Sequence, residues 1–301
     1  MRKNITIKYK TKRKINGFLY VLPFLLGFFL CFAIPLFNTV YYSFHKVSVN
    51  DTGGMKFSFD GIQNYIDLFR SEVTTAAQPM ARLFADQNLE ILTNVPLIVI
   101  FSLFMALLAN LKFKGRGIVR VIYFLPIIFG LEVVMDMLAI TTGGEWAQES
   151  TGLFSESYIS IMLMRYTDIP LSILLPVIGY VDKIFDVLSQ SGVQTLIYLA
   201  GLQSVSPSLY EVAKIEGATA YETFWKVTIP SIMHITLFVT IYTIVDRFLA
   251  SPISEEAYSF AFEKSKIGTG SALSVVYIFN VLLVLGIAML VLRKAVKRYE
   301  K

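Results

Sequence analysis

The chain has 301 residues, of which 55% are hydrophobic and 16% are charged. Its mean hydropathy of +0.60 is too high for an ordinary soluble domain. The single cysteine, Cys31, excludes an intrachain disulfide, and two isolated histidines, His45 and His234, give no support to a metalloenzyme. The sequence contains no GxxxxGK[ST] phosphate loop, GxSxG elbow or paired-histidine zinc helix, so ATP binding of the usual kind and these hydrolytic chemistries are not expected.

Six segments are predicted to cross a membrane as helices, each of which needs about 20 mostly apolar residues. A basic start followed by an apolar run also occurs in signal peptides. Here the run is too long and no A-x-A-like cleavage site closes it, so a retained first helix is expected. The loop 45–88 is expected to carry a short amphipathic helix at 62–69. Five spans are clear in the hydropathy and the sixth is amphipathic in its first half: 15–44, 91–111, 118–140, 229–249, 272–292 and, as the sixth, 176–204.

The lysines and arginines predict the orientation of these spans, because such residues accumulate in cytoplasmic loops. Residues 1–14 hold seven basic residues and no acidic one, and 112–117 and 293–301 are also basic, whereas the other loops are balanced or acidic. Both termini are therefore expected in the cytoplasm, which requires an even number of spans. The predicted organisation is a basic cytoplasmic tail (1–14), a membrane domain (15–292) and a second basic tail (293–301). The charge is split over three segments, so nucleic acid is not an expected partner.

A polar stretch at 206–228 interrupts the apolar segments and has strong helix signals. Ser206 is suited to an N-cap and Pro207 to the first helical position. A helix is predicted over 209–216, followed by a left-handed turn at Gly217 and a second helix over 218–227 that Pro230 breaks. The prediction is a helix, a bend and a second helix at the cytoplasmic surface.

This stretch resembles a known family motif, the EAA loop of the membrane-spanning subunits of ATP-binding-cassette (ABC) importers. The residues before it are similar to the carbohydrate-uptake branch, the maltose- and glycerol-phosphate-type permeases. Val212 and Val227 depart mildly from the usual alanine and isoleucine. The resemblance is carried by Leu199-Ala-Gly-Leu-Gln-Ser-Val-Ser-Pro, by Leu209-Tyr-Glu, by Glu211-x-Ala213-x3-Gly217-x9-Val227-x-Ile229-Pro230 and, more weakly, by Ile91-Leu-Thr-Asn94, Arg120-Val-Ile-Tyr-Phe-Leu-Pro126 and Gly270-Ser-Ala-Leu-Ser.

The resemblance implies an all-α type I ABC-importer transmembrane domain in the cell membrane. The chain would be a permease subunit, not an enzyme, that translocates a carbohydrate, expected to be an oligosaccharide, delivered by an extracytoplasmic solute-binding protein. Its further partners would be a second homologous permease and two ABC ATPase subunits, which bind the ATP and Mg²⁺; no cofactor, metal or catalytic residue is expected on this chain. The residues implied to couple the ATPase to transport are Glu211, Ala213, Gly217, Ala218 and Pro230, with Glu211 facing a basic group of the ATPase.

Several polar side chains within the spans are candidates for the substrate pathway, because polar groups deep in a bilayer are costly. Amides and hydroxyls could bind sugar hydroxyls and an aromatic ring could stack on a sugar. The alternative is that they hydrogen-bond packed helices to one another. The candidates are Glu132, Gln190, Gln194, Thr240, Tyr242, Tyr277 and Asn280.

Other functions stay open at this point. A secondary transporter could use Glu132 as a proton relay, and a membrane scaffold would transport nothing. The stretch 206–228 could also be a solvated surface loop with well-placed caps. The sequence leaves open the identity of the sugar and whether the permeases pair as a heterodimer or a homodimer.

Overall fold

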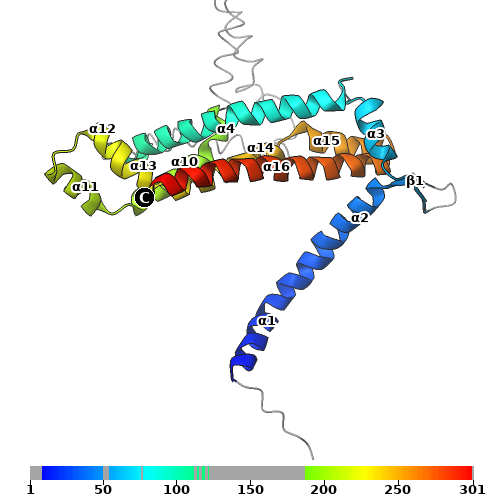
Figure 1. The fold of residues 1–301 in the computed structure, drawn as a ribbon, viewed down its shortest axis with the longest axis horizontal. Helices are drawn as coiled ribbons and strands as arrows, with labels where there is room; N and C mark the ends of the chain where they lie inside the picture. The colour runs from blue at the N-terminus through cyan, green and yellow to red at the C-terminus, as the bar shows by residue number, and fades with distance from the viewer. Residues whose placement is uncertain are drawn as a thin grey trace, which may run out of the picture. The chain divides into compact units, whose positions relative to one another are not determined.

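The computed structural model describes residues 9–49, 54–75, 77–111, 114, 117–118, 121 and 187–299 of the chain. Over these residues it is almost entirely helical (Figure 1). Within this described part, four helical segments are long and apolar enough to cross a membrane: Asn16–Ser43, Met80–Asn110, Met233–Glu263 and Ile267–Lys294. The all-α membrane fold is thus confirmed. The count of six remains a prediction, because most of 118–140 and the first part of 176–204 lie outside the described residues.

Contacts divide the chain into two compact units. Unit 1 comprises Met1–Gln87 and Ala250–Leu283, and unit 2 comprises Asn88–Leu249 and Val284–Lys301. Two long helices, α4 (Met80–Asn110) and α16 (Ile267–Tyr299), contribute to both. α4 begins well before the predicted span at 91. Its first three turns mix apolar core residues such as Met80 and Phe84 with polar and charged ones, so hydropathy alone does not detect them.

Unit 1 begins with the first span, in which α1 (Tyr9–Phe28), the π-helix η1 (Phe29–Ala33) and α2 (Ile34–Ser43) follow without a break. An antiparallel hairpin of β1 (His45–Val49) and β2 (Met55–Phe59) comes next, and then α3 (Gln63–Arg70). α3 matches the amphipathic helix predicted at 62–69. The hairpin was not predicted. Later in the chain, unit 1 holds α15 (Pro252–Tyr258) and the π-helix η3 (Ser259–Glu263).

The core of unit 1 joins α3, α4, α15, η3 and α16, through Leu68, Met80, Phe84, Ile253, Phe260 and Leu273. Two glycines allow backbone segments to approach closely. A Cβ at Gly268 would lie 2.5 Å from the carbonyl oxygen of His45, and one at Gly270 would lie 2.9 Å from that of Ala257. The amide of Asn64 donates to the carbonyl oxygens of Ser43 (2.9 Å) and His45 (3.1 Å), and therefore ties α3 to the end of the first span.

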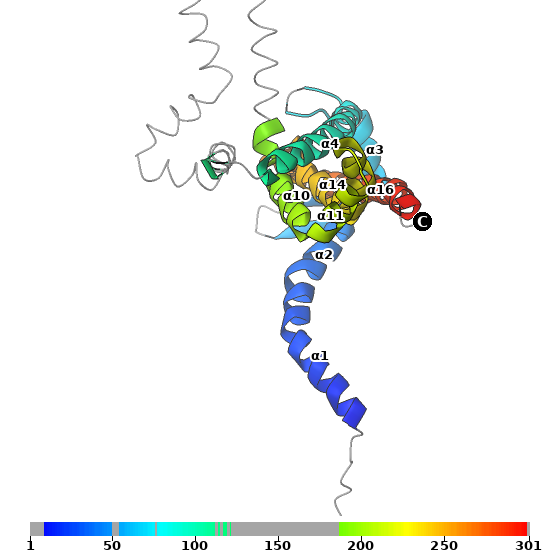
Figure 2. The same cartoon turned by 90° about the vertical axis from the view of Figure 1, so that its left-hand side faces the viewer.

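Unit 2 contains α10 (Gly192–Ser204), α11 (Pro207–Ile215), α12 (Ala220–Thr223), the π-helix η2 (Phe224–Thr228), α13 (Ile229–Ser231) and α14 (Met233–Leu249). α10 lies beside α14 in both views (Figures 1 and 2). Gly201 permits this approach, because a Cβ there would collide with the side chain of Ile235. The core of unit 2 consists of Ala106, Tyr198, Leu199, Leu202, Ile232 and Val239.

Candidate functional site

The polar stretch 206–228, called the coupling segment below, connects α10 to α13 and α14. α11 starts with Pro207 in its first turn, where a missing N–H is not needed, and ends at Ile215, one residue before the predicted end. Ser206 has the extended backbone of an N-cap (φ −61°, ψ 128°). Its hydroxyl lies 2.8 Å from that of Ser208 and does not cap the helix. Ser206 and Pro207 therefore hold the N-cap and first helical positions predicted for them, but the capping bond is absent.

Gly217 ends α11 in the left-handed conformation that the sequence predicted, with φ +76°. Its N–H donates to the carbonyl oxygen of Lys214 (3.1 Å), and the N–H of Ala218 donates to that of Ala213 (2.9 Å). These two bonds make a Schellman motif, which satisfies carbonyls that a helix end leaves unpaired. A residue with a Cβ would be strained here by about 1–2 kcal/mol. The bend consequently depends on the left-handed backbone of Gly217, a conformation that glycine adopts without strain.

A capping box starts the second helix and was not predicted. The N–H of Glu222 donates to the hydroxyl oxygen of Thr219 (3.2 Å), and the N–H of Thr219 donates to the carboxylate of Glu222 (3.0 Å). The bond from the Thr219 backbone, aided by the Thr219 hydroxyl and by Lys226, lowers the pKa of Glu222 below its ordinary range. The spacing Thr-x-x-Glu in the sequence was the available signal.

The second helix differs from the predicted one. Its α-helical part ends at Thr223, and a π-helix continues to Thr228. Pro230 does not break the helix, because it lies in the first turn of α13, where a proline is tolerated. The backbone leaves the helical conformation at Ile232 instead (φ −102°, ψ 6°). π-Helical turns are often found at functional sites.

The two halves of the coupling segment contact each other. Ala213 is buried, and the hydroxyls of Tyr210 and Thr228 lie 3.4 Å apart, which connects α11 to η2. A pocket of about 330 Å³ lies between them, lined by Tyr210, Lys214, Ala218, Ala220, Thr223, Phe224 and Thr228. Ala213 and Ala218, two of the predicted coupling residues, therefore hold the segment together from inside.

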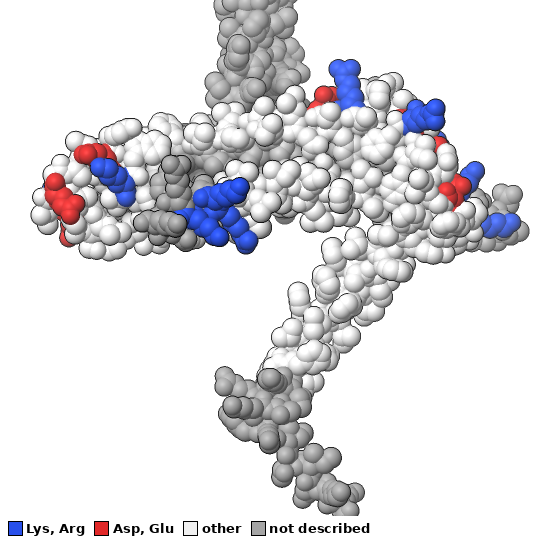
Figure 3. Space-filling model, in the orientation of Figure 1, with Lys and Arg blue, Asp and Glu red and all other residues white. Residues whose placement is uncertain are grey.

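The outer surface of α11 is apolar along one face. Leu209, Val212 and Ile215 are 46%, 52% and 85% exposed and follow one another at helical spacing. Acidic and basic side chains gather at the same end of the unit, over α11 and α12 (Figure 3). Glu211, which was predicted to face an ATPase, is exposed there. An exposed apolar stripe with charges around it is typical of a surface that binds another protein.

The described residues offer no metal centre. Nowhere in the ranges given above do three His, Cys, Asp or Glu side chains come together as metal ligands. What the coupling segment offers instead is an exposed apolar helix face and a defined bend at Gly217.

The predicted pathway residues are divided between the units. Gln190, Gln194, Thr240 and Tyr242 belong to unit 2, Tyr277 and Asn280 belong to unit 1, and Glu132 lies outside the described residues. Gln194 is 1% exposed, and neither polar atom of its amide has a hydrogen-bond partner among the described residues. The hydroxyl of Thr240 donates to the carbonyl oxygen of Thr236 within its own helix (2.8 Å). Because buried polar groups are normally hydrogen-bonded, Gln194 is the strongest of the described candidates for binding a further polar group.

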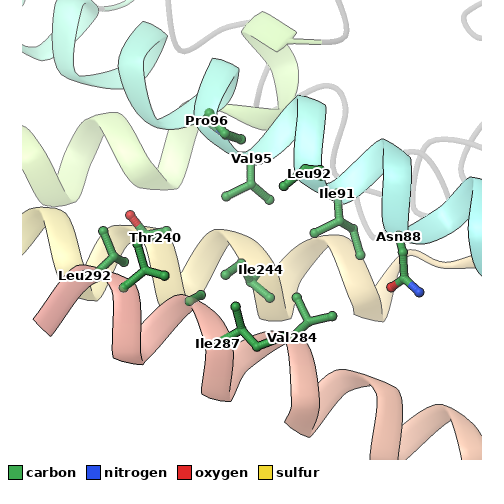
Figure 4. A pocket seen from close by; sticks show the side chains of 12 residues that line it. Asn88, Ile91, Leu92, Val95, Pro96, Thr240, Ile244, Val284, Ile287 and Leu292 are labelled. Atoms are coloured by element: carbon green, nitrogen blue, oxygen red, sulfur yellow. The ribbon is translucent and has the colours of Figure 1, made fainter. Parts of the chain in front are cut away.

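A second pocket of unit 2, of about 410 Å³, lies between α4, α14 and α16 (Figure 4). Its polar side chains are Asn88 and Thr240, and the rest of its lining is aliphatic: Ile91, Leu92, Val95, Pro96, Ile244, Val284, Ile287, Ala288, Val291 and Leu292. A sugar needs many donors and acceptors, and the Thr240 hydroxyl is already engaged. This pocket suits hydrocarbon, so it is not the expected carbohydrate site.

The fold is that of a multi-pass membrane protein in which a polar helical segment lies between two apolar helices, and solved structures share this fold. A bacterial alginate ABC transporter, solved in complex with an alginate pentasaccharide-bound periplasmic protein, contains a chain that matches with a TM-score of 0.64. The match is 17% identical and covers 95% of this chain and 96% of that one. A second structure of an alginate-importing ABC transporter gives a TM-score of 0.65 at 18% identity.

Sequence comparison finds relatives among sugar-transport permeases. The chain is 27% identical over 248 residues to the trehalose/maltose transport system permease protein MalF of Thermococcus litoralis, covering 82% of this chain and 78% of that protein. It is 25% identical over 306 residues to the arabinooligosaccharides transport system permease protein AraP of Halalkalibacterium halodurans, covering 96% and 91%. No protein-family model matches the sequence. The predicted resemblance to the carbohydrate-uptake family of ABC transporter permeases is confirmed, and the fold is that of an ABC importer permease.

Proposed function

We propose that the chain is the membrane-spanning permease subunit of an ATP-driven importer that translocates a carbohydrate. The observation that carries the proposal is the coupling segment: an exposed apolar helix face (Leu209, Val212 and Ile215) ends in a Schellman turn at Gly217, and α12, η2 and α13 connect this turn to the membrane helix α14. Such a segment passes a movement of a bound partner to the helices on either side. Relatives whose names include maltose, trehalose and arabinooligosaccharides support an oligosaccharide substrate.

The proposed partners follow from the same resemblance. A second permease would complete the pathway, and an extracytoplasmic binding protein would deliver the sugar. Two ABC ATPase subunits, one of them bound to α11, would hydrolyse ATP with Mg²⁺. Both termini and the coupling segment would lie in the cytoplasm. Closure of the ATPases would move the segment from Glu211 to Pro230 and thereby drive alternating access, while this chain itself performs no chemistry.

The proposal is tested by sugar uptake into vesicles that contain the complete complex. Uptake should persist when an ionophore removes the proton gradient and should stop when the ATPase lacks its catalytic base. The two outcomes that contradict the proposal differ: uptake that the ionophore abolishes and the inactive ATPase does not affect indicates a secondary transporter, and unchanged sugar flux after deletion of the chain indicates a scaffold.

A further inference from the structure

One face of the β1–β2 hairpin is apolar and aromatic. Successive side chains of a strand point to opposite faces, so alternate residues and their cross-strand partners share a face. The register pairs His45 with Phe59 and Val47 with Phe57. Phe59 is 76% exposed and Met55 is 52% exposed. This hairpin face, which we call the aromatic face, presents Met55, Phe57 and Phe59 as exposed side chains and includes His45 and the buried Val47.

The aromatic face lies next to the exposed apolar surface of the first span. α2 ends at Ser43 and β1 begins at His45, so a single residue separates the membrane helix from the hairpin. The ring of Tyr42 stacks on that of Phe57 with centroids 5.3 Å apart, and the ring of Tyr41 stacks on that of His45 at 4.1 Å. Tyr41 lies in the last turn of the span and is itself 45% exposed.

The length of the hairpin keeps it near the end of the span. A strand of five residues is about 17 Å long, and both strands return to the same end because the hairpin is antiparallel. Tyr41 and Tyr42, in the last turn of the span, are of a residue type that membrane proteins place at the boundary between hydrocarbon and headgroups, and the hairpin rings pack against them.

The opposite face of the hairpin is polar and cationic. Lys46 pairs with Ser58 across the strands, and Lys56 lies two residues before Ser58 on the same face. All three are exposed. Side chains of Lys or Arg are visible at the end of unit 1 that carries β1, beyond the uncharged surface of α2 (Figure 3). Long cationic side chains in such a place extend to lipid phosphate groups.

We propose that the β1–β2 hairpin is an interfacial anchor: its aromatic face lies in the lipid at the end of the first span, and Lys46 and Lys56 bind lipid phosphate. The partner is the bilayer surface, because the exposed Met55, Phe57 and Phe59 lie on a hairpin that one residue separates from an exposed apolar membrane helix, and the cations lie on the opposite face of the hairpin. The proposal does not depend on the transported substrate or on the ATPase.

Two neighbouring reporters on opposite faces test the proposal. In a Trp146→Phe, Trp225→Phe background, the Phe59→Trp variant carries a tryptophan on the aromatic face and the matched Ser58→Trp variant carries one on the polar face. Both positions are exposed, so neither change disturbs the core of unit 1. Each complex is placed in phosphatidylcholine vesicles, and the fluorescence of the same complex without a reporter is subtracted to remove the tryptophans of the partner subunits. The remaining fluorescence is quenched by spin-labelled lipids from within the bilayer or by iodide from the water.

The expected result is a loss of Phe59→Trp fluorescence with a shallow lipid spin label and protection from iodide, together with the opposite pattern for Ser58→Trp. Phe59→Trp emission should also be shifted to the blue. Equal access of iodide to both reporters, with no lipid quenching of either, would overturn the proposal. Protection of Phe59→Trp that appears only after the solute-binding protein is added would overturn it as well, because the face would then bind a protein.

Discussion

Two regions of the molecule are held together in different ways. One is the coupling segment; the other is the outer cluster of unit 1, which consists of the packed residues of α3, α15, η3 and the start of α16. In the coupling segment the hydrogen bonds at the bend and the cap join residues close in sequence: Gly217 to Lys214, Ala218 to Ala213, and Thr219 to Glu222. Its longest connection joins Tyr210 to Thr228. Every one of these bonds can persist while the segment moves as a piece.

In unit 1 the bonds join segments far apart in the chain. Glu256 accepts from the backbone N–H (2.7 Å) and the hydroxyl (3.1 Å) of Thr75, and Lys266 forms an ion pair with Glu72. The amide of Asn64 bridges two backbone carbonyls. Unit 1 is thus built as a fixed body. Local bonds are suited to the coupling segment, which we propose transmits movement, whereas long-range bonds are suited to unit 1, which resists it.

The largest expected difference between the two regions is their side of the membrane. In a Cys31→Ser background, Asp60→Cys and Phe262→Cys should react in intact cells with a membrane-impermeant thiol reagent, and Ile215→Cys should not. All three positions are exposed in the structure, so protection reports the membrane and not burial. The lysine and arginine bias is the physical reason. Labelling of Ile215→Cys from outside would contradict both the topology and the coupling role.

A methyl group at Gly268 tests the rigidity of unit 1. It would lie 2.5 Å from the carbonyl oxygen of His45, so the Gly268→Ala variant should lose stability by about 1–3 kcal/mol through overpacking. Thermal unfolding of the purified complex measures this. The matched control is Gly286→Ala in the same helix, where nothing lies within 4 Å of the added methyl. Equal unfolding temperatures for the two variants would show that the contact at Gly268 does not constrain unit 1.

The pathway candidates of the two units can be compared by transport. Glu132→Gln, Gln194→Leu and Asn280→Leu should each change the uptake of the preferred sugar by about 5- to 150-fold, because an unpaired polar group costs about 1–3 kcal/mol. Assembly of the complex should be unaffected. Uptake of several oligosaccharides by reconstituted complexes is the measurement, and wild-type rates for every sugar in all three variants would make these residues interhelical contacts.

The smallest expected effect concerns the capping box. Thr219→Ala should speed hydrogen exchange in residues 219–223 about fivefold, the equivalent of the roughly 1 kcal/mol that an N-cap contributes. Because the pKa of Glu222 is lowered in the folded state, its share of the protection is complete above its ordinary pKa range and is lost as the pH falls through the lowered value. Glu222→Gln should remove this acid dependence. Wild-type exchange in Thr219→Ala would show that the cap does not hold the helix.

The sequence predicted the features that depend on local chemistry or hydropathy. The first span, α3, the turn at Gly217 and α11 all lie within a few residues of their predicted bounds. The hairpin was not predicted, because its strands have only five residues each and lie in a loop whose clearest pattern is that of an amphipathic helix. Their alternation, His45-Lys-Val-Ser-Val and Met55-Lys-Phe-Ser-Phe around Asp-Thr-Gly-Gly, is nevertheless a recognisable strand signal.

Other features could not have been predicted from one sequence. The burial of Gln194 and the fit of Gly268 against His45 depend on which helices pack together, and neither is encoded by residues adjacent in the chain. The same limit applies to the pathway residues, whose membership in two different units has no signature in their spacing.

The most direct test of the coupling role compares two substitutions of Gly217. Valine cannot readily adopt the φ of +76° found there, whereas asparagine tolerates left-handed backbone. In the reconstituted complex, the Gly217→Val variant should lose sugar-stimulated ATP hydrolysis and uptake while it still docks the binding protein. Glu211→Lys, which reverses the charge offered to the ATPase, should do the same, and Gly217→Asn should retain most of the stimulation. Wild-type stimulation in both Gly217→Val and Glu211→Lys would contradict the account.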